Sequence, residues 1–295
     1  MSTAVAVAGP SRGIVLVLLA HIAFTTMDAT NKALAATYPV TQIVWAFYVG
    51  FALAALARAA GSGGVGPSLR TRRLGLQLLR AALLPVNMAC VVLALSLMSM
   101  AEVMAVGISY PLMITVLSAL VLKEHVGARR WTAVVVGLLG VLLILKPGLG
   151  VFNPASLLVL AAAALFAVYQ IMTKILGRTD RPVTLGLYTA LLGAAVYTAL
   201  LPFDFHVPDA QGWAMLTLAA AGGTIGHMLV IEALEAAPAS VLQPFNYVQL
   251  VWATIAGYLV FGELPDEMTV LGATVVVGSG LYVWWRERVR AGAVR

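Results

Sequence analysis

Ten long apolar stretches follow one another along this 295-residue chain, separated by short connections that carry most of the charges. A helix needs about 20 apolar residues to cross the roughly 30 Å hydrocarbon core of a bilayer. Nearly every stretch approaches that length, and the fifth is the shortest. They occupy residues 13–36, 40–56, 74–97, 101–122, 131–145, 154–175, 183–201, 212–234, 240–261 and 268–285. We therefore expect ten transmembrane segments.

Composition and pattern together select the fold class. The chain is 61% hydrophobic and only 10% charged, with a mean hydropathy of +0.97, which excludes a soluble globule. Membrane β-strands would alternate apolar and polar residues, whereas these stretches are uniformly apolar. In lipid a segment must pair its own backbone polar groups. The expected fold is an all-α integral membrane protein.

Basic residues gather on alternate connections between the stretches. If the N-terminus is cytoplasmic, 15 of the 18 Lys and Arg residues lie on the cytoplasmic side, and only Lys146 lies opposite. Lys32 and Arg80 fall inside stretches. This asymmetry follows the positive-inside rule and predicts that both termini are cytoplasmic. The net charge of +6 then reflects contact with anionic lipid headgroups. The sequence has no stripe of basic residues interleaved with aromatics, so the charge is poor evidence for nucleic-acid binding.

The second half of the chain repeats the first. The pattern NK followed by PVT in residues 31–41 recurs as TK followed by PVT in residues 173–184. A shift of 139 residues superposes ALSLMSMAEV on ALEAAPASVL, and Glu124 on Glu263. The expected units are residues 1–147 and 148–295, each with five segments.

Because five is odd, the second unit should enter the membrane from the opposite side. Glu124 should then lie on the cytoplasmic face and Glu263 on the external face. Inverted repeats are typical of secondary transporters, whose site forms near the bilayer midplane between the halves. The repeat therefore predicts a carrier that works by alternating access.

Several short motifs, present in both halves, carry a family resemblance. They are Lys32 followed by Pro39, the Ala-Leu pairs at 94–95 and 233–234, Pro111, the LKE and FGE ends at Glu124 and Glu263, and the glycine-rich fifth and tenth segments. With these motifs the chain resembles the EamA-type ten-helix permeases of the drug/metabolite transporter superfamily. The resemblance implies a bacterial inner-membrane carrier with a central cavity. Many relatives have a basic residue in the second segment, where this chain reads QIVWAFYVG. The absence of a basic residue there disfavours strongly anionic solutes. In this respect the second segment resembles that of amino-acid and metabolite exporters, including the aromatic amino-acid exporter type.

The first segment carries a polar stripe. His21, Thr25, Asp28 and Lys32 recur at spacings of four, three and four, with Asn31 beside them, so they share one helical face. Charged groups in a membrane segment normally face protein or a watery cavity. Asp28 and Lys32 also form an i,i+4 pair in the favourable order, so mutual neutralisation is an alternative interpretation. We expect Asp28 and Asn31 at the cavity, with Asp28 a candidate for proton coupling.

Other polar and aromatic side chains recur at spacings that fit a cavity wall. Pro244 and Pro111 predict interruptions in the ninth and fourth segments. A lone membrane histidine is often a helix-to-helix partner, and a single aromatic is often packing. The remaining candidates for substrate contact are Trp45, Asn87, Tyr110, Tyr169, Gln170, His227, Gln243, Asn246 and Tyr247.

Catalytic and metal chemistry have no matching pattern in the sequence. The four histidines lack metal-ligand spacing, Cys90 is the only cysteine, and HExxH and P-loop motifs are absent. We therefore expect neither an enzyme nor a resident cofactor. A channel is less favoured than a carrier because of the repeat. The expected function is export of small metabolites, aromatic or neutral amino acids first, by a monomer or homodimer. A drug or other metabolite permease of the same family is the alternative, and coupling to protons is left open.

Overall fold

The computed structural model describes residues 10–123, 126–146 and 153–293, and within these ranges every regular element is helical. In the first half the elements are α1 (Pro10–Leu34), α2 (Val40–Gly61), α3 (Val65–Ser68), α4 (Leu74–Leu97), α5 (Met100–Gly107), α6 (Tyr110–Val121) and α7 (Ala128–Leu145). In the second half they are α8 (Ala155–Leu176), α9 (Pro182–Leu200), η1 (Leu201–Phe203), α10 (Ala210–Ala236), α11 (Ala239–Leu242), η2 (Gln243–Tyr247), α12 (Val248–Phe261) and α13 (Glu267–Ala293).

Nine segments of the described chain are long and apolar enough to cross a membrane. They coincide with nine of the ten predicted stretches. The predicted stretch at 240–261 is divided into α11, η2 and α12, and its longest helix has only 14 residues. The expected all-helical membrane fold is therefore confirmed, and the ninth stretch is divided into shorter helices although its continuous apolar run suggests a single one.

The interruption follows from local chemistry. Pro244 has no backbone N–H and clashes with the preceding turn, so the chain passes through the tighter η2 before α12 begins. The fourth segment breaks in the same way between α5 and α6, just ahead of Pro111. Broken membrane helices are tolerated where protein or a watery cavity surrounds the freed backbone groups. Both breaks lie next to the candidate functional site.

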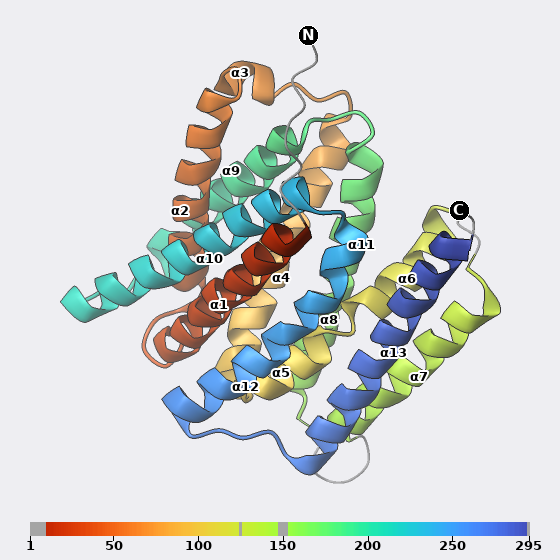
Figure 1. Cartoon of the computed structure of the whole chain (residues 1–295). Helices are drawn as coiled ribbons and strands as arrows, with labels where there is room; N and C mark the ends of the chain where they lie inside the picture. Colours follow the sequence, from red (N-terminus) through yellow and green to blue (C-terminus); the bar gives the residue numbers. More distant parts are fainter. Residues whose placement is uncertain (1–9, 124–125, 147–152, 294–295) are drawn as a thin grey trace.

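Helices of the first half pack against helices of the second. α1 lies along α10, α8 along α4, α2 against α9, and α7 beside α13 at the right-hand side of Figure 1. Glycines permit the closest approaches: a Cβ on Gly140 of α7 would lie 2.8 Å from the Gly272 carbonyl of α13. Likewise, a Cβ on Gly222 of α10 would lie 2.9 Å from the Ala23 carbonyl of α1. Small residues at helix contacts are the expected packing mode in lipid.

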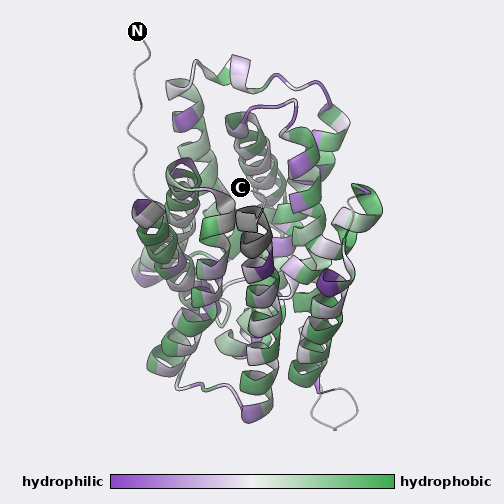
Figure 2. Ribbon diagram, turned by 45° about the vertical axis from the view of Figure 1, so that its right-hand side comes forward, coloured by the Kyte–Doolittle hydropathy of each residue, from purple (hydrophilic) through white to green (hydrophobic). Residues whose placement is uncertain are grey.

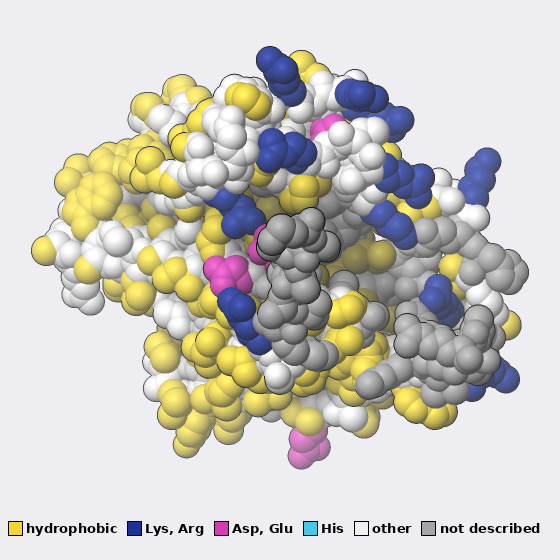
Figure 3. All heavy atoms as spheres, turned by 45° about the horizontal axis from the view of Figure 1, so that its top comes forward, with side chains coloured by type: hydrophobic (Ala, Val, Ile, Leu, Met, Phe, Trp, Pro, Cys, Tyr) yellow, Lys and Arg dark blue, Asp and Glu magenta, His cyan; other side chains and the backbone are white. Residues whose placement is uncertain are grey.

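The surface matches a lipid environment. Hydrophobic residues dominate the helices in Figure 2, and many large apolar side chains are exposed, including Leu53, Leu120 and Leu259. Lys and Arg side chains are spread over the end of the molecule that comes forward in Figure 3. Apolar flanks with charged ends are typical of a membrane-embedded bundle.

Candidate functional site

The polar face of α1 is buried against η2 and α12. His21, Thr25, Asp28 and Asn31 are each at most 6% exposed. The imidazole Nε2 of His21 lies 3.1 Å from Oδ1 of Asn246, and the amide of Gln249 donates to Asp28 over 3.4 Å. The periodicity of the α1 stripe thus corresponds to a real contact face, and its partners come from the interrupted ninth segment.

Lys32 does not pair with Asp28. Its Nζ lies 2.9 Å from the Glu263 carboxylate and donates to the Met98 carbonyl over 2.6 Å, beside the Phe261 ring. The alternative of i,i+4 neutralisation is therefore wrong, because a stronger set of partners arrives from the ends of α4 and α12. Among the described residues, the Asp28 carboxylate has one side-chain hydrogen bond, the weak one from the neutral amide of Gln249. Glu124, which the repeat superposes on Glu263, lies outside the described residues.

Aromatic side chains form a row that leads away from these polar contacts. Tyr110 at the start of α6 lies beside Asn246 and Tyr247. Its ring packs edge-on against Phe166 of α8 at 5.0 Å, and Phe166 stacks on Tyr169 at 6.0 Å. All five of these side chains are partly exposed. Partly exposed rings of this kind provide faces against which a flat molecule can stack.

His227 occupies a neighbouring aromatic environment. Its ring lies 5.1 Å from Phe24, 5.9 Å from Phe47 and 5.1 Å from Phe51. Nδ1 is hydrogen-bonded to the carbonyl of Gly223, one turn earlier in α10. The contact with Phe24 connects His227 to the α1 stripe, because Phe24 also meets His21.

Two of the predicted residues make hydrogen bonds between helices. Trp45 of α2 donates to the hydroxyl of Thr198 on α9, and Asn87 of α4 donates to the Ala162 carbonyl of α8 over 2.7 Å. Gln170 is partly exposed on α8 beside Tyr169. The side chain of Gln243 lies outside the described residues. The structure therefore holds Trp45 and Asn87 between helices. It brings together, by direct contact or along one helix face, Asp28, Asn31, Tyr110, Tyr169, Asn246 and Tyr247.

Two polar residues of the site are not singled out by the sequence pattern. Gln249, the partner of Asp28, follows Asn246 by three residues and is the one amide in an apolar helix. Arg80 of α4 is 0% exposed and lies 4.8 Å from the Tyr169 ring centroid. The signal available for both was a polar side chain inside an apolar stretch, which in a membrane indicates function.

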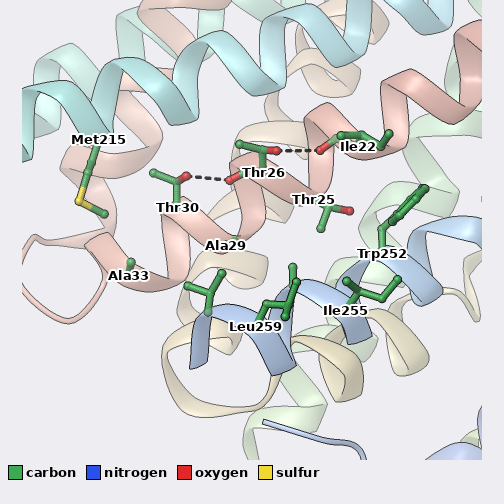
Figure 4. A pocket seen from close by; sticks show the side chains of 12 residues that line it. Ile22, Thr25, Thr26, Ala29, Thr30, Ala33, Met215, Trp252, Ile255 and Leu259 are labelled. Carbon is green, nitrogen blue, oxygen red and sulfur yellow. Dashed lines mark hydrogen bonds between the residues drawn. The ribbon is translucent and has the colours of Figure 1, made fainter. Parts of the chain in front are cut away.

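A groove of about 460 Å³ opens on the side of the bundle between α1, α10 and α12 (Figure 4). Thr26 and Thr30 bond their hydroxyls to carbonyls one turn earlier on α1, so they present methyl groups to it. Leu259 lines it from α12 and is 74% exposed. The groove is therefore apolar and faces the surroundings of the bundle, on the opposite side of Thr25 from the polar contacts.

The described residues contain no cluster of three or more His, Cys, Asp or Glu side chains that could hold a metal ion. Cys90 is a free thiol in α4. The chemistry available at the site is therefore hydrogen bonding, aromatic stacking and the charges of Asp28, Lys32, Glu263 and Arg80.

Comparison with known proteins gives consistent results. The EamA-like transporter family matches residues 11–146 and again residues 153–285. A riboflavin transporter of Vibrio cholerae is 31% identical over 287 residues, which is 95% of this chain and 96% of that protein. An S-adenosylmethionine uptake transporter of Rickettsia prowazekii is 28% identical over 75% of each chain. The pseudopaline exporter CntI of Pseudomonas aeruginosa is 24% identical over 90% of this chain and 93% of that one.

A solved crystal structure supports the fold. It superposes with a TM-score of 0.62 at 19% identity and covers 92% of this chain and 95% of its own. The apolar spans and the transporter relatives together identify a multi-pass protein of the bacterial inner membrane. The chain is a membrane transporter that belongs to the EamA-like transporter family of the drug/metabolite transporter superfamily.

Proposed function

We propose that this transporter exports small aromatic or neutral metabolites, amino acids first among them, by alternating access through a central cavity between its halves. The substrate class is inferred from the row of partly exposed rings formed by Tyr110, Phe166 and Tyr169. This row ends at the polar contact between His21 of α1 and Asn246. Rings provide a surface for a flat solute, and a few polar groups fix its orientation.

The membrane topology is part of the proposal. We infer ten crossings, with the interrupted 240–261 segment as the ninth, cytoplasmic termini, and two inverted five-helix units at residues 1–147 and 148–295. Support comes from the pairing of α1 with α10 and α8 with α4, because these pairs exchange when the halves are exchanged. The separate family matches to residues 11–146 and 153–285 fit the same division.

A ligand panel tests the substrate. The full chain in proteoliposomes should show saturable counterflow of tryptophan, tyrosine or phenylalanine. Flux that rises linearly with concentration indicates a pore, and chemical conversion of the solute indicates an enzyme; either result contradicts the proposal.

Riboflavin is a second candidate. It is favoured by the Vibrio cholerae relative, which is named a riboflavin transporter. A three-ring flavin also suits the aromatic row better than a small aliphatic amino acid does. Counterflow of riboflavin without counterflow of any amino acid would select it.

Alanine substitutions in the interrupted segment should weaken binding. We expect Asn246→Ala and Tyr247→Ala each to raise the Kd for a transported solute by about tenfold, the effect of one lost buried hydrogen bond. Gln243→Ala should have the same effect. Microscale thermophoresis with the purified protein measures the Kd of each variant. Thr254→Ala is the matched control, since that α12 hydroxyl bonds the Leu250 carbonyl of its own helix. Equal Kd values in all four variants would contradict a substrate role for this segment.

The Lys32 contacts should hold the external side closed. Lys32 joins the end of α1 to the ends of α4 and α12 through Met98 and Glu263. In a Cys90→Ser background, Lys32→Met should therefore increase the labelling of Asn31→Cys by an impermeant maleimide several-fold, because Asn31 is 0% exposed while these contacts are in place. Arg58→Met is the control, since it breaks the exposed pair with Glu235. Unchanged labelling in Lys32→Met would show that these contacts do not gate access.

A further inference from the structure

Arg80 is a buried cation held by neutral groups. Its side chain is 0% exposed within α4. Nε donates to Gln77 over 3.0 Å, Nη1 donates to Thr173 over 3.1 Å, and Nη2 donates to Thr189 over 3.0 Å and to the Leu185 carbonyl. No carboxylate of the described chain lies within ion-pair distance of it. The positive charge is therefore oriented by three helices but left without a counter-charge.

This arrangement is costly for a structural clamp. Burying an ion without a charged partner costs several kcal/mol, whereas a neutral amide could link the same hydroxyls. The guanidinium has five N–H donors, and the four acceptors leave one N–H of Nη1 unused. A cation that is fixed in place and uncompensated in a low-dielectric interior attracts an anion strongly.

Tyr169 connects this charge to the aromatic row. Its ring lies 4.8 Å from the guanidinium carbon of Arg80, and the ring is partly exposed although Arg80 is not. From Tyr169 the row continues through Phe166 and Tyr110 to Asn246. A solute lying along the row therefore meets the positive potential of Arg80 at one end.

The other end of the row carries a negative group. Asn246 bonds His21, and Gln249 of the next turn donates to the buried carboxylate of Asp28. Asp28, like Arg80, has no ion-pair partner within the part of the chain that the structure describes. The two uncompensated charges thus lie at opposite ends of one aromatic surface, and they have opposite sign.

We propose that Arg80, acting through Tyr169, makes this site selective for amphoteric aromatic solutes, with the carboxylate of the solute toward Arg80 and its cationic group toward Asp28. This rests on the proposed function and names the substrate chemistry of that site. Arg80 is a specificity-determining residue that positions the anionic end, and Asp28 attracts the cationic end. The sum of the two site charges is zero, which suits a solute that carries one charge of each sign.

Three related indoles test the anionic and the cationic end of the solute separately. Tryptophan has both charges, tryptamine lacks the carboxylate, and indole-3-propionate lacks the ammonium. Competition for binding to the purified full chain should favour tryptophan over either by about tenfold or more, the effect of one charge-assisted contact. In Arg80→Gln the tryptophan-to-tryptamine ratio should fall to about one, while the tryptophan-to-indolepropionate ratio persists. Asp28→Asn should do the reverse.

Further variants distinguish charge from packing. Arg80→Lys keeps the charge and should keep the selectivity. Thr189→Val removes one hydrogen bond from Arg80 and should also leave the ratio unchanged. Tyr169→Leu removes the ring beside Arg80 but leaves the four Arg80 hydrogen bonds intact, and it should lower the ratio. This variant keeps the test available if Arg80→Gln does not fold.

The outcomes are distinguishable. If the indoles bind and their ratios are unmoved in folded Arg80→Gln or Tyr169→Leu, the inference is wrong and the proposed function stands. If no indole binds, the affinity ratio is measured for flavin mononucleotide and riboflavin instead, because these two flavins differ by one anionic phosphate group. Absence of binding by every indole and flavin overturns the proposed function and the inference with it.

Discussion

Replacing Asp28 with asparagine is expected to abolish solute flux that is driven by an imposed pH gradient. Asp28 is 4% exposed and accepts one hydrogen bond, from the neutral amide of Gln249. His21 lies about two helical turns away on the same face, and Lys32 is held by Glu263. Asp28 is therefore the carboxylate at the site without a fixed cationic partner, and a group of this kind can exchange its charge for a proton during transport.

The measurement compares proteoliposomes with equal and unequal pH across the membrane. Gradient-driven flux through Asp28→Asn should fall to the level seen without a gradient, because asparagine cannot bind or release the proton. Counterflow at equal pH should continue. Glu235→Gln is the control, since that carboxylate is exposed and pairs with Arg58 at the bundle surface. If wild-type flux shows no response to the gradient, transport is facilitated diffusion and proton coupling is excluded.

Gly193→Val is expected to cause the largest loss of stability. A Cβ at Gly193 of α9 would overlap the ring of Tyr48, which is 0% exposed on α2 and stacked at 6.2 Å on Tyr197. The Tyr48 ring has little room to move, because Phe47 and Phe51 also pack against it. Overpacking of this kind costs about 3 kcal/mol or more.

Thermal unfolding in detergent, followed by fluorescence-detected gel filtration, measures this loss. The Tm of Gly193→Val should fall by several degrees, or the variant should fail to accumulate as a monodisperse peak. Gly186→Val provides a matched control, because it changes the same helix at a position with open space around a new Cβ. A Tm equal to that of the wild type would mean that α2 and α9 are not packed as described.

Much of the fold could be predicted from residue patterns. Nine of ten apolar stretches correspond to candidate spans, because membrane insertion depends on the hydropathy of about 20 consecutive residues and little else. The tenth, at 240–261, is equally apolar but contains Pro244, and hydropathy does not distinguish a broken helix from a continuous one. The prolines indicated both interruptions, yet the length of η2 depends on its packing against α1 and α13.

The candidate site was predictable only in part. Helical periodicity placed His21, Thr25, Asp28 and Asn31 on one face, since that relation is local. The partner of Lys32 was not predictable, because Glu263 lies far away in the sequence and competes with an acceptable local partner, Asp28. Trp45 is an aromatic residue of a type that often lines cavities, and its indole N–H donates a hydrogen bond from α2 to the hydroxyl of Thr198 on α9.

The residue pattern alone is enough to predict that the chain lies in a membrane, where most of its long apolar helices begin and end, and which family it resembles. These properties depend on short windows of hydropathy, on charges at helix ends and on local motifs. Which polar groups meet is known from the folded molecule: His21 contacts Asn246, 225 residues away, and Arg80 contacts two helices of the second half. The rotation of each helix about its axis is set by packing against several neighbours at once, so no single segment encodes it.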